Sequence, residues 1–372
     1  MTPAHPAATE PVVRKAQLTG GSTFTVSLPK DWAEAQGLQA GAELWLYALE
    51  DRVVVAPAAR EPAGQAVTVD ADCLDGAALA RRLQVAYTAG YETIAVSAAG
   101  GLDGDRRRTA ARTLGELVGL DVDRGATDGL VARSLLDTTE VSPTQTRAQL
   151  RRLATAMHED AATALVDGDA GLAATVRRRR ADVDRQVALL TRQFTGALVD
   201  VTELERLRTS RETAYRHARA ARELGRIADQ AAAIAALAVP DDGDGATPNG
   251  RGEPLPDPLA AAVREACDAL LGLLTAALEG PADAVEPRRR ALEAAVGAAE
   301  RTSREAAVDG IRIGRATARY RQAGSVAEEL AAVRESGELA ADGAGAERAT
   351  DGAGAERAAD GAGGESPGSG VD

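Results

Sequence analysis

The pattern of polar and apolar residues between positions 16 and 57 predicts four short strands around one helical turn. Residues 16–28 alternate small polar with apolar side chains on both sides of Gly20-Gly21, as two strands joined by a turn would. Pro29 ends the second strand, because proline cannot donate to a ladder, and it can open a helix that Gly37 closes. The predicted elements are strands within 16–28, a helix at 30–36 and strands at 43–49 and 52–55.

The period changes after a Pro- and Gly-containing linker that ends near Gly64. Strand-like and helix-like segments then alternate, which predicts a small α/β module over 65–137 that acts as a spacer or a regulatory layer. Its predicted elements are strands at 67–69, 92–97, 120–124 and 130–136 and helices at 74–89 and 106–118.

From Ser142 onward the pattern is helical almost to the end of the chain. Ser142-Pro143 is a capping residue followed by proline at the first helical position, and Gly168 breaks the first helix. Two trios of long helices with short connections predict two up-down-up bundles, at 142–238 and 257–335. The predicted helices are 143–167, 169–194 and 200–237, then 257–279, 281–305 and 309–334.

Three segments have compositions typical of disorder. Residues 1–11 are rich in Ala and Pro, and residues 239–256, rich in Gly, Asp and Pro, are expected to form a flexible loop between the two bundles. Residues 336–372 repeat the motif Ala-Asp-Gly-Ala-Gly-Ala-Glu-Arg, which has no apolar face to bury and predicts a disordered acidic tail.

Charge and composition limit the partners of the chain. Its 372 residues carry a net charge of −13 with only two lysines, Lys15 and Lys30, a balance that resembles proteins of salt-accumulating halophiles and to which a GC-rich genome also contributes. Such a chain repels DNA at long range, so any DNA binding must be local. Cys73 and Cys267 have no metal or disulfide spacing, and we expect both to be buried in a protein from a reducing compartment. Without a signal peptide or spanning segment, we expect a soluble cytoplasmic protein.

Signatures of catalysis are weak in this sequence. Neither lysine lies in a P-loop, and Ser27 with Lys30 matches a Ser-x-x-Lys motif only on paper, because Ser27 ends a predicted strand. The histidines His5, His158 and His217 are too scattered for a metal site. We therefore expect a non-enzymatic protein with no cofactor.

The phrase from Leu18 to Leu46, with Leu28-Pro29-Lys30, Gly37-Leu38 and Gly41, resembles the AbrB/SpoVT/MazE family. That resemblance implies a swapped-hairpin β-barrel over 12–57, made of two interleaved chains that bind DNA. Its size agrees, because a unit of about 45 residues without metal or disulfide cannot bury a core alone and needs a partner chain.

Candidate DNA contacts are polar and cationic residues of this segment: Arg14, Lys15, Ser22, Thr23, Lys30 and Arg52. A partner chain would double the cationic groups, and the hydroxyls at the hairpin turn can donate to phosphates. However, residues 14–57 carry four cationic side chains against five carboxylates, so shape and base contacts must contribute more than charge. The alternative is that the barrel serves only for dimerisation.

The helical half resembles archaeal PhoU-domain regulators in three motifs: Met157-His158-Glu159-Asp160-Ala161, Asp182-Val183-Asp184 and the segment from Arg222 to Ala231. The resemblance covers 142–335 and is clearer in the first bundle. It implies two tandem PhoU-like bundles and a non-enzymatic regulator that acts with a phosphate transporter and its signalling kinase.

PhoU helices often carry carboxylates four residues apart that bind divalent metals, and this chain departs from that pattern. Arg180 precedes Asp184 by four residues, and Gly225 precedes Asp229 by four. An arginine replaces a metal ligand with a fixed positive charge, so we expect no metal site. Instead, we expect the two aspartates to pair with neighbouring arginines such as Arg226 or Arg185.

Together these observations predict a homodimeric multidomain α+β protein, with an N-terminal barrel, an α/β module and two helical bundles. The predicted function is a DNA-binding transcriptional regulator of phosphate uptake or of phosphate-responsive genes. The alternative is a protein–protein adaptor for a phosphate transporter or its signalling partner. The four-arginine run 177–180 could also contact nucleic acid, but a solvated helix face explains it better.

Overall fold

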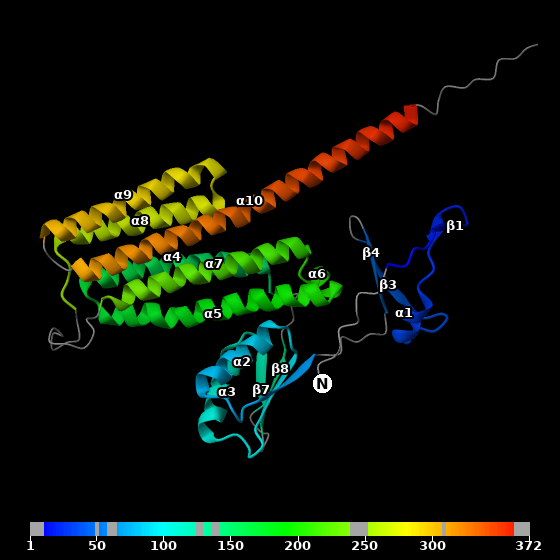
Figure 1. Ribbon diagram of the computed structural model, residues 1–372, viewed down its shortest axis with the longest axis horizontal. Coiled ribbons are helices and arrows are strands. Elements are labelled where there is room, and N and C mark those ends of the chain that lie inside the picture. The colour runs from blue at the N-terminus through cyan, green and yellow to red at the C-terminus, as the bar shows by residue number, and fades with distance from the viewer. Residues whose placement is uncertain are drawn as a thin grey trace, which may run out of the picture. The chain divides into compact units, whose positions relative to one another are not determined.

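The computed structural model divides into two compact units, residues 1–64 and 65–372, each of which is described by itself (Figure 1). The residues that it describes are 11–48, 52–57, 65–123, 129–135, 141–238, 252–306 and 310–360, with side chains for all but 201 and 340–360.

The first unit has the predicted order of strand, strand, helix, strand, strand. Gly20 and Gly21 both have positive φ at the turn of the first hairpin. Pro29 stands just before the helix as its N-terminal flanking residue instead of at its first position. The elements are β1 (Gln17–Thr19), β2 (Thr23–Thr25), α1 (Lys30–Ala35), β3 (Leu44–Ala48) and β4 (Val53–Pro57).

The two hairpins of the first unit form separate two-stranded antiparallel sheets, β1-β2 and β3-β4. Among its described residues only Tyr47, at 7% exposure, is buried. Helix α1 buries none of its residues. A single copy of this unit therefore has almost no core of its own, as its small size predicts.

The second unit begins with a four-stranded sheet in the order β5-β6-β8-β7. Strands β5 and β6 are parallel, and the other pairs are antiparallel. Leu79 and Leu83 of the first helix pack with Ile94 and Leu130 of the sheet, and all four are fully buried. The elements are β5 (Ala66–Asp70), α2 (Gly76–Thr88), β6 (Thr93–Ser97), α3 (Gly104–Glu116), β7 (Leu120–Asp123) and β8 (Gly129–Ser134).

Six long helices follow and share one hydrophobic core. Helices α4, α5 and α7 pack together, as do α8, α9 and α10, and α7 also packs along α10 (Figure 1). The bounds are α4 (Pro143–Asp167), α5 (Ala170–Val199), α6 (Val201–Arg206), α7 (Arg211–Ala236), α8 (Asp257–Glu279), a 3₁₀ turn η1 (Ala282–Ala284), α9 (Val285–Ala306) and α10 (Gly310–Asp360).

The caps explain why the first helix begins and ends where predicted. The Ser142 hydroxyl accepts a hydrogen bond from the backbone N–H of Gln145 at the start of α4. Gly168 has a left-handed φ of 63° at its end. A capping side chain and a left-handed glycine are signals that a sequence carries locally.

The predicted third helix, 200–237, is wrong as one continuous element. Helix α6 ends at Arg206, and Arg208 adopts a positive φ of 48°. Ser210 then caps α7, its hydroxyl accepting from the N–H of Thr213 at 3.1 Å. A serine that can restart a helix competes with helix continuation, and the apolar stripe on both sides of the break concealed it.

The predicted disordered tail and loop differ from the structure where they are described. Helix α10 continues to Asp360, far beyond the expected end at 334. Alanine, glutamate and arginine favour this continuation, whereas the glycines of the repeat oppose it. At the other segment, the N–H of Leu255 donates to the carbonyl of Val166 at 2.8 Å, so residues 252–256 are held against α4. The expectations for residues 1–10, 239–251 and 361–372 lie outside the described residues.

Arginines close the C-terminal ends of two helices. Arg312 donates to the carbonyl of Leu165 at 2.7 Å, and Arg334 donates to the carbonyl of Ala277 at 3.1 Å. The last carbonyls of a helix have no partner within it, and a cationic donor also complements the negative end of the helix dipole. These side chains of α10 thus fasten it to α4 and α8.

Arg192 of α5 fastens the α/β module to the helical bundle. It is 8% exposed and donates from Nη1 to the carbonyls of Tyr87 and Tyr91, at 2.8 and 2.9 Å. Its guanidinium also lies 4.9 Å from the centre of the Tyr87 ring. A buried cation held by two carbonyls and a ring face makes the contact specific.

We predict that Arg192→Met lowers the free energy of unfolding by about 2–4 kcal/mol, because two carbonyls lose a charged donor inside a buried contact. Urea denaturation measures the loss, and hydrogen exchange should rise at the end of α2. Arg177→Met, on an exposed position of the same helix, is the control and should change stability by less than about 0.5 kcal/mol. Equal stability of the two variants would contradict the prediction.

Candidate functional site

The six predicted DNA-contact residues are all exposed and lie on four segments of the first unit. Arg14 and Lys15 precede β1 instead of entering it, and Arg52 precedes β4. Ser22 stands in the turn before β2, and Thr23 is the first residue of that strand.

Lys30 is the first residue of α1 and pairs with Glu34 one turn later, at 3.5 Å. Both side chains are highly exposed, at 84% and 65%, so the pair is weak and can exchange for a phosphate.

In the bundle, Arg180 stands between the two aspartates that the sequence singles out. Its guanidinium bonds Asp184 one turn along α5 and Asp229 on α7. The predicted ion pairing is confirmed, but the expected partners are wrong. Arg185 pairs with Asp182, and Arg226 pairs with Glu223 and Glu329. Sequence distance could not reveal Arg180 as the partner of Asp229, because the two lie on different helices.

The charges of this triad depend on one another. Burial raises the pKa of Asp184, and the attraction of Arg180 offsets this only in part. Burial lowers the pKa of Arg180, but the two carboxylates outweigh it and raise the pKa overall. An arginine that remains charged therefore occupies the position from which a metal ion would contact both aspartates.

Gly225 has a packing role that the sequence did not reveal. A Cβ atom at this position would lie 3.2 Å from Cγ2 of Val187, so α5 and α7 approach too closely for a larger side chain without adjustment. A side chain at position 225 would require Val187 to shift by a few tenths of an ångström. Within the part of the chain that the structure describes, no group of three or more His, Cys, Asp or Glu residues could hold a metal ion.

His158 lies at the centre of the helical core and is fully buried. Its Nε2 lies 3.0 Å from the carbonyl oxygen of Ile227, and Cys267 donates from Sγ to the carbonyl of His158 at 3.5 Å. Burial lowers the pKa of His158 to about 4 and raises the pKa of Cys267 to about 12. Both groups are therefore neutral at pH 7. Cys73, in contrast, is exposed, and the expectation that it is buried is wrong.

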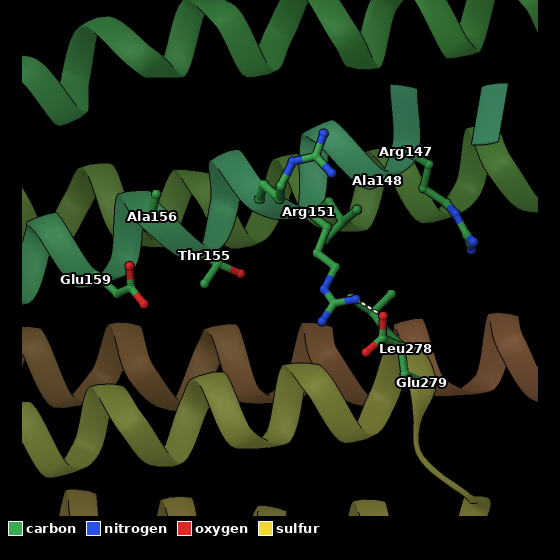
Figure 2. A pocket seen from close by; sticks show the side chains of 10 residues that line it. Arg147, Ala148, Arg151, Thr155, Ala156, Glu159, Leu278 and Glu279 are labelled. Carbon is green, nitrogen blue, oxygen red and sulfur yellow. Dashed lines mark hydrogen bonds and ion pairs between the residues drawn. The ribbon is translucent and has the colours of Figure 1, made fainter. Parts of the chain in front are cut away.

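A hollow between α4, α7 and α8 went unrecognised in the sequence. It measures about 580 Å³ and is open to solvent (Figure 2). Arg147, Arg151 and Arg152 line it from α4, with Glu159 two turns after Arg152 and Glu279 at the end of α8. The signal in the sequence was the spacing of 147, 151 and 152, which places arginines on one side of a helix.

No helix in the described part of the chain is long and apolar enough to cross a membrane.

Comparison with known families finds two domains in this chain. Residues 17–63 match the model of the family described as antidote-toxin recognition MazE, bacterial antitoxin, and residues 148–238 match the PhoU domain. Both resemblances expected from the sequence are confirmed, whereas the helices from 257 onward lie outside these matches. No curated protein and no solved structure gives a significant match. A MazE-type domain and a PhoU domain in one chain support a phosphate-related regulator or adaptor.

We predict that Arg180→Ala lowers the free energy of unfolding by about 1 kcal/mol at pH 7, a modest loss because both aspartates are about half exposed. The deficit should shrink as the pH falls, because protonation of Asp184, whose pKa burial already raises, removes an unpaired charge. Urea denaturation at pH 7 and pH 5 measures both effects. Arg177→Ala is the control, and a deficit that grows on acidification would contradict the argument.

We predict that His158 makes the helical bundle sensitive to acid. Its pKa is about 4 in the folded state against 6.5 ordinarily, so the unfolded state binds the proton first. Stability should fall as the pH drops below about 6.5 and level off below about 4, a loss of roughly 3 kcal/mol. His217, whose pKa is also lowered to about 4, adds a similar loss, so His158→Gln should remove about half of the total loss that urea denaturation measures between pH 7 and pH 4.5. Met157→Leu, at a neighbouring buried position, should leave it unchanged.

Proposed function

We propose that this protein is a DNA-binding transcriptional regulator of phosphate uptake or of phosphate-responsive genes, and that it works as a homodimer through its MazE-type unit. The observation that carries the proposal is the joining of two domains in one chain, a MazE-type unit and a PhoU domain. Both belong to non-catalytic families, which supports regulation instead of catalysis.

The surface of the MazE-type unit supports a second copy of the chain as its partner. Phe24 and Leu46 are 72% and 68% exposed, and Trp45 is 54% exposed. Two-stranded hairpins are marginal in water, and apolar side chains at this density are expected to be covered. In the proposed arrangement two copies interleave their hairpins into one swapped-hairpin barrel, which buries these side chains.

The proposed DNA contacts are the six residues of this unit described above. Pairing two copies doubles Arg14, Lys15, Lys30 and Arg52, while the hydroxyls of the hairpin turn contact phosphates. Because residues 14–57 carry a net negative charge, we expect binding to depend on shape and base contacts more than on charge. Arg14 and Lys15 are two adjacent cations, so replacing both tests the proposed DNA surface with one variant. Both lie just before the matched range, which begins at residue 17.

The helical half is proposed to receive the signal. It would dock on a phosphate-transport or signalling component and change how the paired units present their cationic residues to DNA. The alternative is an adaptor that binds only other proteins, with the MazE-type unit used for assembly. The excess of carboxylates in residues 14–57 and the Lys30–Glu34 pair favour that alternative.

We predict that crosslinked pulldown of the tagged protein, sequenced across the host genome, yields discrete peaks at phosphate-transport promoters that change between high and low phosphate. The variant Arg14→Glu/Lys15→Glu should lose these peaks, because it replaces cations at the DNA surface with carboxylates that repel phosphates.

Two controls make this experiment decisive. Light scattering must show that the variant has the same oligomeric state as the wild type, so that lost peaks report lost DNA contacts. Glu34→Gln, which releases Lys30 from its ion pair, should retain or strengthen the peaks. An absence of peaks in the wild type, with its oligomer intact, would overturn DNA binding and favour the adaptor.

A further inference from the structure

We propose that the hollow between α4, α7 and α8 is a binding site for a small molecule that carries a phosphate group. Its rim is cationic, with Arg147, Arg151 and Arg152, and its floor is aliphatic, with Leu224 and Leu278. Guanidinium groups bind phosphate oxygens in pairs of parallel hydrogen bonds, and an apolar floor accepts the body of an organic ligand. The site is independent of whether the MazE-type unit binds DNA.

Two of the three arginines have no carboxylate partner among the described residues. Arg147 and Arg152 make no ion pair there, whereas other arginines of the same bundle are held by one or two carboxylates. Arg179 bonds Asp160, for example, and Arg321 bonds Glu293 and Glu300. Exposed arginines such as Arg177 and Arg301 also make no ion pair with a described residue, but Arg147 and Arg152 line a hollow and stand beside a third arginine, Arg151.

The electrostatic environment of Arg147 is unfavourable without an anion. Burial, and then the positive charge of Arg151, lowers the pKa of Arg147. The positive charge of Arg147 also acts on His217 of α7. Nε2 of His217 lies 3.5 Å from Oγ1 of Thr144, near the start of α4. Burial, Arg147 and Arg216 together lower the pKa of His217 to about 4. A bound phosphate would relieve this repulsion.

Arg151 is a third possible phosphate ligand, but it is already paired with Glu279. It extends from α4 and bonds Glu279 at the end of α8, while Arg147 extends away from this pair (Figure 2). Glu279 is more than half exposed, so water can solvate it when Arg151 leaves. A phosphate group would therefore compete with Glu279 for Arg151 and loosen a link between α4 and α8.

The size of the hollow indicates more than a free ion. Its volume of about 580 Å³ lies within the usual range for small-molecule sites, roughly 300–1,000 Å³. Thr155 and Glu159 lie on the side of the hollow away from the Arg151–Glu279 pair and offer a hydroxyl and a carboxylate (Figure 2). These groups can accept or donate hydrogen bonds to a polar body such as a sugar.

The test is isothermal titration calorimetry of the full-length protein with inorganic phosphate, with AMP and with adenosine, at constant ionic strength. AMP should bind, and adenosine should bind at least tenfold more weakly, because it lacks the phosphate. Comparing inorganic phosphate with AMP shows whether the hollow prefers a free phosphate ion or an organic molecule that carries a phosphate group. Binding of either ion supports the site. Tighter binding of AMP than of inorganic phosphate would indicate that the adenosine part contacts the aliphatic floor.

Three variants locate the site. Arg147→Gln/Arg152→Gln should weaken binding at least tenfold and leave the fold intact, because neither side chain makes an ion pair with a described residue. Glu279→Gln should tighten binding several-fold, because it frees Arg151. The charge-matched control Arg177→Gln/Arg301→Gln, at exposed positions outside the hollow, should change affinity less than twofold.

The pKa of His217, measured by NMR titration, provides an independent readout. If the arginines had only a structural role, adding the ligand would not change this pKa. Bound AMP or phosphate should raise the pKa of His217 from about 4, because it neutralises the arginine field. The proposal is overturned if neither ion binds at millimolar concentration, if adenosine binds as tightly as AMP, or if the Arg147→Gln/Arg152→Gln variant binds like the control.

Discussion

Close packing of alanines is the constraint on which the helical half depends. With aromatic residues at 2% of the sequence, few bulky side chains are present to separate the helices, and much of α7 that is buried is alanine. Short side chains let helices approach closely. At the surface of the bundle, Arg226 of α7 bonds Glu223 on its own helix and Glu329 on α10. Arg321 of α10 bonds Glu293 and Glu300, both on α9. These ion pairs thus help to fix how the helices are oriented relative to one another, because small apolar side chains specify the orientation less.

An arginine that links two helices also stands where the PhoU-like pattern would place a metal-binding carboxylate. Arg180 bonds Asp184 and Asp229, and Gly225 lets α5 lie against α7. A metal ion would supply comparable cross-linking only while it was bound, whereas an arginine supplies it permanently. An organic cation therefore links α5 and α7 at this place. Around the hollow the situation differs, because two of its three arginines, Arg147 and Arg152, have no carboxylate partner among the described residues.

The sequence was sufficient where the information is local. Ser142 and Gly168 are capping residues, so the bounds of α4 could be predicted to the residue. The break between α6 and α7 could not, because its apolar stripe continues on both sides and only the conformation of Arg208 reveals it. The pairing of Arg180 with Asp229 and the position of Glu279 beside Arg151 depend on how helices pack, which no periodicity encodes. The DNA-contact residues remain a prediction, because their surface needs a second chain.

Helix α5 has a mechanical consequence for the whole second unit. Arg180 fixes it to α7, and Arg192, twelve residues later and about 18 Å along the axis, fixes it to the α/β module. A continuous hydrogen-bonded helix resists compression between these points. A shift of α5 along its axis would therefore act on the end of α2 and the turn after it, where Tyr87 and Tyr91 accept from Arg192.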